Sequence, residues 1–80
     1  MNDDNKGFSF YGENNILFIS LKSVSEISVV KISDWYELTI TTTTNNAYNI
    51  SSKDKNELLN VIICFKLNKT CSYYGEWICL

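Results

Sequence analysis

Polar and hydrophobic residues alternate along the first two thirds of the chain, and this pattern predicts a series of β-strands. The alternation is cleanest from Trp35 to Thr43. It directs one set of side chains toward a core: Tyr36, Leu38, Ile40 and Thr42. Turn-forming residues at 44–46 then lead into Ala47 to Ile50. The sequence therefore predicts a β-hairpin over residues 35–50.

Three further segments before this hairpin have the composition of strands. Residues 8–11 are separated by the turn-forming segment 12–15 from the apolar segment 16–21, which predicts a second hairpin. Residues 26–32 carry β-branched side chains and form another expected strand. Because the 16–21 segment is apolar on both of its faces, we expect it to lie in the centre of a sheet.

An apolar stretch at 58–67 breaks the alternation and predicts a helix from about Lys53 to Leu67. Ser51 and Ser52 are the candidate N-caps. The helical spacing directs three side chains toward the sheet: Leu58, Ile62 and Phe65. The β-branched residues at 61–63 also permit a strand over 61–67, so this segment has two interpretations.

Strands followed by one helix predict an α+β fold, in which a small antiparallel meander of about five strands carries the helix on one face. Residues 71–80 are expected to add a short terminal strand or a small hairpin. Eighty residues allow one small core. We therefore predict a single domain over 8–80, preceded by a disordered or loosely ordered tail at 1–7.

Composition argues against catalysis and against cofactor binding. The chain has no His, the side chain that titrates near pH 7. It also has no Arg, the planar cation that forms bidentate hydrogen bonds with carboxylates or phosphates. Three Cys without His are too few for a structural zinc site. The sequence therefore predicts a protein that is not an enzyme and has no cofactor and no metal.

The location and the source are inferred from charge and residue usage. Residues 1–7 are polar and acidic, unlike a signal peptide, and the apolar stretch at 58–67 is shorter than the roughly 18 residues that cross a bilayer. A cytoplasmic protein without membrane contact is expected. Frequent Asn, Ile and Lys, beside absent Arg, Pro and Gln, indicate an AT-rich genome such as that of a phage or other mobile element.

Two cysteines are candidates for a disulfide. A three-residue turn at 74–76 places Cys71 directly opposite Cys79, within the reach of a cross-strand bond. The reducing cytoplasm favours free thiols, so pairing of these two residues stays open. Cys64 lies in the apolar helix and is expected to pack in the core.

Aromatic side chains with acidic neighbours form the candidate binding site. The predicted protein interface consists of Asp34, Trp35, Glu37, Tyr73, Tyr74, Glu76 and Trp77. Such a surface fits a protein partner with a basic patch, and the net charge of −2 opposes binding to nucleic acid. We expect a small non-catalytic inhibitor or regulator, of the anti-defence or immunity type if it comes from a phage. The alternative is an adaptor that self-associates, as a homodimer, through a sheet edge or the aromatic surface.

Overall fold

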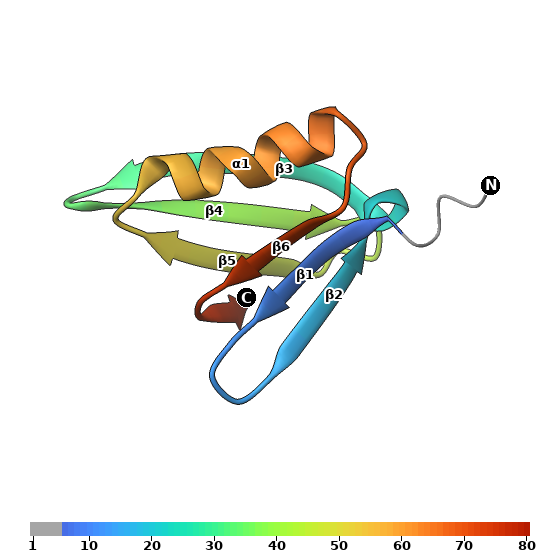
Figure 1. The fold of residues 1–80 in the computed structure, drawn as a ribbon, viewed down its shortest axis with the longest axis horizontal. Coiled ribbons are helices and arrows are strands. Elements are labelled where there is room, and N and C mark those ends of the chain that lie inside the picture. Colours follow the sequence, from blue (N-terminus) through green and yellow to red (C-terminus); the bar gives the residue numbers. More distant parts are fainter. Residues whose placement is uncertain (1–5) are drawn as a thin grey trace.

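The computed structural model describes residues 6–80 and contains two β-sheets and one α-helix (Figure 1). The elements are β1 (Gly7–Tyr11), β2 (Ile16–Ser20), β3 (Val24–Ile32), β4 (Trp35–Thr42), β5 (Ala47–Ser52), α1 (Lys55–Lys66), β6 (Cys71–Tyr74) and β7 (Trp77–Cys79). A 3₁₀ turn, Leu21–Ser23, joins β2 to β3. The predicted α+β class and the predicted helix are confirmed, and the strand alternative for 61–67 is wrong.

The strands form two separate sheets. A three-stranded sheet has the order β2-β1-β6, with β6 parallel to β1, and an antiparallel four-stranded sheet has the order β3-β4-β5-β7. Both predicted hairpins are present, and in the second one Leu38 lies opposite Ile50. Asn45 adopts a φ of 68° in the turn of that hairpin, a conformation that Asn tolerates. The predicted terminal hairpin is wrong, because β6 and β7 pair with strands of different sheets.

One face of the four-stranded sheet is covered by both α1 and the three-stranded sheet, which lie side by side on it (Figure 1). Within the described residues 6–80, the core between these layers contains ten buried hydrophobic residues: Phe8, Phe10, Ile19, Leu21, Val24, Leu38, Ile40, Ile50, Leu58 and Val61. Aromatic rings link the layers, since the Phe8 ring lies 6.4 Å from that of Phe65 on α1. The other face of each sheet has no layer over it among residues 6–80.

Helix α1 differs from its prediction at its start and in its buried face. Its N-cap is Asp54, whose carboxylate accepts a hydrogen bond from the Asn56 N–H at 2.9 Å, rather than Ser51 or Ser52. Leu58 and Val61 are the buried helix residues. Ile62 and Phe65, which were predicted to face the sheet with Leu58, are only half-buried. The i, i+3 row from Leu58 to Val61 meets both sheets at once, whereas Ile62 lies further round the helix, at the rim of the contact.

Strand β2 lies at an edge of its sheet, so its predicted central position is wrong. Its Ile19 is buried in the core, but Ile16 is 69% exposed and Phe18 is 50% exposed. The apolar character of this strand on both faces therefore reflects a core face and an uncovered hydrophobic face.

The predicted N-terminal tail lies mostly outside the described residues, which begin at Lys6. Gly7, which was assigned to that tail, is the first residue of β1 and is buried. A side chain at this position would collide with the backbone carbonyl of Ile19 and the ring of Phe18, so the close approach of β1 to β2 requires glycine here.

Candidate functional site

The structure does not bring the seven predicted interface residues together on one surface. Tyr73 and Trp77 point into the core, where their rings lie 6.1 Å from Phe10 and 6.3 Å from Tyr48, respectively. The Trp77 indole N–H is buried without a hydrogen-bond partner among the described residues. Trp77 is therefore a packing residue, and its truncation is expected to weaken the fold rather than to affect binding alone.

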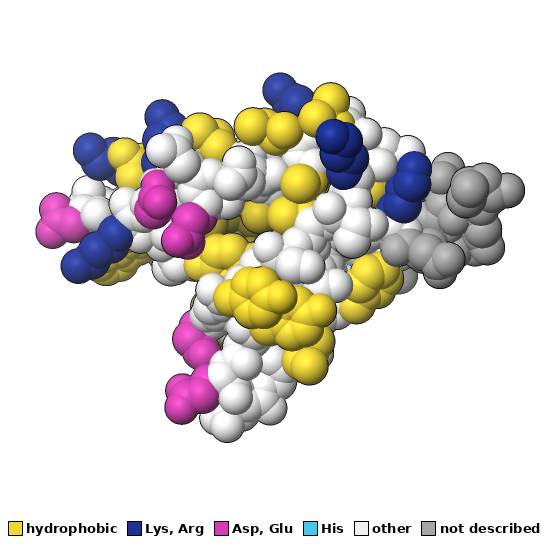
Figure 2. All heavy atoms as spheres, viewed as in Figure 1, with side chains coloured by type: hydrophobic (Ala, Val, Ile, Leu, Met, Phe, Trp, Pro, Cys, Tyr) yellow, Lys and Arg dark blue, Asp and Glu magenta, His cyan; other side chains and the backbone are white. Residues whose placement is uncertain are grey.

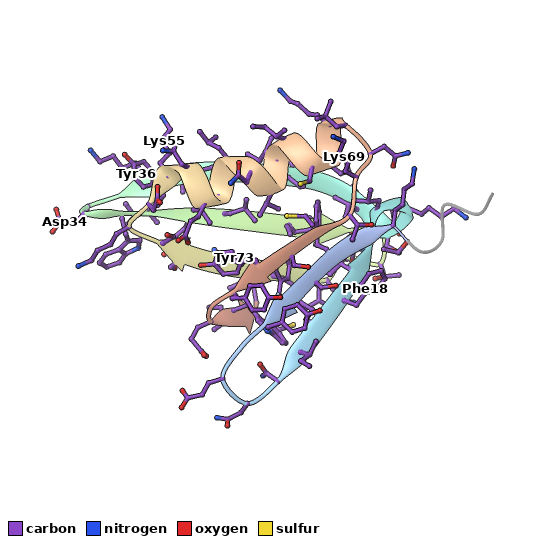
Figure 3. The ribbon with its side chains drawn as sticks, viewed as in Figure 1. Phe18, Asp34, Tyr36, Lys55, Lys69 and Tyr73 are labelled. Atoms are coloured by element: carbon purple, nitrogen blue, oxygen red, sulfur yellow. The ribbon has the colours of Figure 1, made fainter. Side chains whose placement is uncertain are left out.

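The other five predicted residues lie in two separate regions. Tyr74 is on the outer face of the three-stranded sheet, and Glu76 lies in the turn between β6 and β7. Asp34 is in the β3–β4 turn, which Figure 3 shows at one tip of the molecule, and Trp35 and Glu37 follow it on β4. Because neighbouring residues of a strand point to opposite faces, Tyr73 and Tyr74 cannot share a surface.

The first candidate surface is the uncovered face of the four-stranded sheet around Trp35. We define the Trp35 surface as Val30, Ile32, Asp34, Trp35 and Glu37. Trp35 is 39% exposed, and its indole Nε1 donates a hydrogen bond to Glu37 Oε2 at 3.3 Å. Ile32 lies opposite Trp35 and Val30 opposite Glu37 in the β3–β4 pairing. Both apolar neighbours are exposed, by 40% and 52% respectively, so they border the indole as an apolar strip.

Glu37 is held from both sides on this face. Its Oε1 accepts a hydrogen bond from Asn49 Nδ2 at 3.4 Å, and the same amide donates to Thr39 Oγ1 at 3.2 Å. Asn49 is only 7% exposed, so it forms a firm support beneath the carboxylate. A hollow of about 240 Å³ adjoins the indole and is lined by Trp35, Ser51, Ser52 and Lys53.

The second candidate surface is the uncovered face of the three-stranded sheet. We define the tyrosine surface as Tyr11, Ile16, Phe18 and Tyr74. The rings of Tyr11 and Tyr74 stack, with centroids 4.8 Å apart and an interplanar angle of 14°. Tyr74 is 76% exposed, and Figure 2 shows hydrophobic side chains gathered over this sheet.

Three of the four residues of the tyrosine surface were missed from the sequence. The signal was present, because aromatic residues occupy positions of both parities at 8–11 and apolar residues do so at 16–19. A strand with one covered face needs apolar residues at only every second position. The additional residues Tyr11, Ile16 and Phe18 therefore mark an uncovered hydrophobic face.

A scan against protein-family models finds no match, and searches of curated proteins and of solved structures find no similar protein either. Within residues 6–80 no helix has the length and apolar character required to cross a bilayer. The same part of the chain holds no group of three or more His, Cys, Asp or Glu side chains placed to bind a metal ion.

The cysteines are arranged differently from their prediction. Cys71 lies beside Phe8 in one sheet and Cys79 lies opposite Tyr48 in the other, so the predicted cross-strand pair does not form. All three thiols are free. Asn68, with a φ of 57°, ends the helix, and the Lys69 N–H donates to the Cys64 carbonyl at 2.8 Å. This tight exit brings Cys71 next to Cys64.

Burial, and secondarily the neighbouring Cys64 thiol, together raise the pKa of the Cys71 thiol to about 11. Burial, and secondarily the charge of Glu57, also raises the pKa of Tyr73. Cys71, Tyr73 and Glu57 line a hollow of about 280 Å³ between α1 and β6. A thiol with a raised pKa is protonated at pH 7 and is a poor nucleophile. The Cys71 thiol in this hollow is therefore less reactive than an ordinary thiol.

The raised pKa of Cys71 predicts a loss of stability at alkaline pH. The unfolded thiol ionises near its usual value of 9.0 while the folded thiol keeps its proton to about 11. The contribution is therefore fully present below pH 9 and is lost as the pH rises toward 11. Urea unfolding at a series of pH values should show a smaller alkaline loss in Cys71→Ser than in the wild type. Tyr73 titrates in the same direction, so part of the loss should remain.

Removal of the exposed Cys79 thiol, as Cys79→Ser, is the matched control for this measurement. An alkaline loss of the same size in Cys71→Ser and in the wild type would contradict the assignment to Cys71.

Proposed function

We propose that the chain is a small non-catalytic protein-binding protein, an inhibitor or regulator that binds its partner stoichiometrically through the Trp35 surface. The observation that carries this proposal is the Trp35 indole, which is exposed on an uncovered sheet face and fixed there by Glu37. Tryptophan is among the residues most enriched in binding hot spots. A side chain already held in place loses less conformational entropy when a partner covers it.

The charges beside the indole indicate the chemistry of the partner. Asp34 and Glu37 place two carboxylates near it, one just before Trp35 in the chain and one two residues after it, and Lys53 lines the adjoining hollow. The two carboxylates favour a partner with a basic patch, because complementary charge raises the association rate. Val30 and Ile32 supply apolar contact area next to these charges. The surface therefore suits a protein that presents a basic residue beside an apolar one.

The raised pKa values of two titratable groups, and the lack of His, support the proposal that the protein is not a catalyst. Burial raises the pKa of Cys71 and of Tyr73, so both side chains keep their protons to a higher pH than usual. This opposes nucleophilic or general-base chemistry in the hollow beside α1. The chain also has no His to act as a base. Binding needs none of these groups.

The setting of the proposal comes from residue usage. A phage or mobile-element origin, with a role in the host cytoplasm of the anti-defence or immunity type, agrees with the small size, the acidic charge and the AT-rich composition. A partner that is a host protein would then have to be bound tightly by a small surface, which favours a rigid aromatic anchor.

Affinity capture with matched variants tests this function. Wild-type protein, Trp35→Ala and Tyr74→Ala are immobilised and exposed to a lysate of the native host. We expect one partner to be retained in equimolar amount by the wild type and by Tyr74→Ala, and to be lost with Trp35→Ala. Tyr74→Ala is the matched control, because it truncates an exposed aromatic residue on the other sheet.

Surface plasmon resonance with the captured partner then separates anchoring from steering. Trp35→Ala should raise the dissociation rate about thirtyfold, as expected for a hot-spot residue. Glu37→Lys should lower the association rate, most clearly at low salt. Loss of the partner with Tyr74→Ala but not with Trp35→Ala would overturn the assignment of this surface.

A further inference from the structure

The tyrosine surface is hydrophobic and uncovered, and the proposed function does not use it. Ile16, Phe18 and Tyr74 are exposed by 69%, 50% and 76%, and the Tyr74 ring stacks on that of Tyr11. Register places these side chains together, since Tyr11 lies between Ile16 on β2 and Tyr74 on β6. Contiguous apolar surface of this kind marks an interaction site.

The two ends of this surface carry opposite charges. At the turn end, Glu76 Oε1 accepts a hydrogen bond from the Glu13 N–H at 2.9 Å, which brings two acidic residues together. At the other end, Lys6 precedes β1, Lys22 follows β2 and Lys69 precedes β6. Figure 2 shows acidic side chains at the turn end and basic side chains toward the opposite end, where Figure 3 labels Lys69.

We infer that the tyrosine surface binds a second copy of this chain, face to face, with the strands of the two three-stranded sheets antiparallel. A two-fold axis perpendicular to the strands would bring the acidic end of each copy against the basic end of the other. An axis along the strands would oppose like charges. The charge distribution therefore selects one arrangement, and symmetry makes each favourable contact occur twice.

The distance between the charged ends supports a second copy over a uniformly basic partner. Lys69 and Glu76 lie beyond the two ends of β6, a strand that itself spans roughly 13 Å at about 3.3 Å per residue. This exceeds the screening length of about 8 Å at physiological ionic strength, so the two ends do not neutralise each other within one molecule. A uniformly basic partner would meet repulsion at the lysine end. A copy of the same surface meets attraction at both ends.

The dimer leaves the Trp35 surface accessible, because that surface lies on the other sheet, and on the face of it turned away from the core. Self-association and partner binding are thus separate properties. A dimer would present two Trp35 surfaces to its target, which increases avidity for a partner that is itself repeated or dimeric.

Sedimentation equilibrium over a range of protein concentrations tests the inference. The wild type should fit a monomer–dimer equilibrium, and Tyr74→Ser should raise its Kd at least thirtyfold. Phe18→Ser, on the neighbouring strand, should act in the same direction and guards against a fold defect in the first variant. Trp35→Ser is the control and should leave the Kd unchanged. Circular dichroism establishes that each variant is folded.

A charge exchange tests the antiparallel arrangement. Glu76→Lys and Lys69→Glu should each raise the dimer Kd about tenfold, since each turns two symmetric attractions into repulsions. The double variant Glu76→Lys with Lys69→Glu should recover most of the wild-type affinity. A wild type that is monomeric at all concentrations would overturn the inference. So would a dimer that responds to Trp35→Ser rather than to Tyr74→Ser, or a double variant as weak as the single ones.

Discussion

Phe8→Ala is expected to lower the free energy of unfolding by about 3–5 kcal/mol, the range for loss of a large buried aromatic side chain. Phe8 has no exposed surface. Its ring lies 6.1 Å from that of Phe10 within β1 and 6.4 Å from that of Phe65 on α1. Its removal therefore weakens the packing of the three-stranded sheet against the helix. A domain of this size has a total stability of only about 4–12 kcal/mol, so the variant should lose a large fraction of it.

Urea unfolding followed by circular dichroism measures this effect. The matched control is Phe18→Ala, which removes the same side chain from the neighbouring strand, where it is 50% exposed. The control should change stability by less than about 1 kcal/mol at protein concentrations that keep the chain monomeric. An equal loss in both variants would contradict the assignment of one core face and one uncovered face to the three-stranded sheet.

Local patterns were sufficient to predict the elements of this fold. The turn residues of the two hairpins and the alternation from Trp35 onward correctly located four strands, because hairpin pairing depends on residues that are close in sequence. The helix was correct to within two residues at each end. Its N-cap was displaced, since seven polar residues, 51–57, precede the apolar run and three of them, Ser51, Ser52 and Asp54, have a side chain able to cap.

The division into two sheets could not be predicted. It depends on parallel pairing of β1 with β6, in which Phe8 lies beside Cys71, and no local signal specifies a partner so distant in the chain. The candidate site residues are dispersed for the same reason. Residues 71–80 were predicted to form a short terminal strand or a small hairpin, whereas the turn at Gly75 passes the chain from one sheet to the other. This transfer turns Tyr73 and Trp77 into the core and leaves Tyr74 outside.

Leu58→Ala is expected to lower the free energy of unfolding by about 2–5 kcal/mol. Leu58 lies on the first turns of α1, has no exposed surface and belongs to the core shared by both sheets. Its truncation leaves a cavity where the helix contacts the four-stranded sheet. For an 80-residue domain, a change of 1 kcal/mol shifts Tm by roughly 4–8 °C, so the midpoint should fall by at least about 8 °C.

Ile63→Ala is the control on the same helix, because Ile63 is 49% exposed. It also gains helix propensity, since alanine replaces a β-branched residue, so its Tm should stay within a few degrees of the wild type. Ile62→Ala and Phe65→Ala should fall between the two, as half-buried side chains at the rim of the contact lose fewer neighbours. For Leu58, Ile62 and Ile63 this order follows from the angular position of each residue around the helix axis, whereas Phe65 lies on the buried face but in the last turn of α1. A loss at Ile63 as large as that at Leu58 would mean that α1 presents a different face to the sheets.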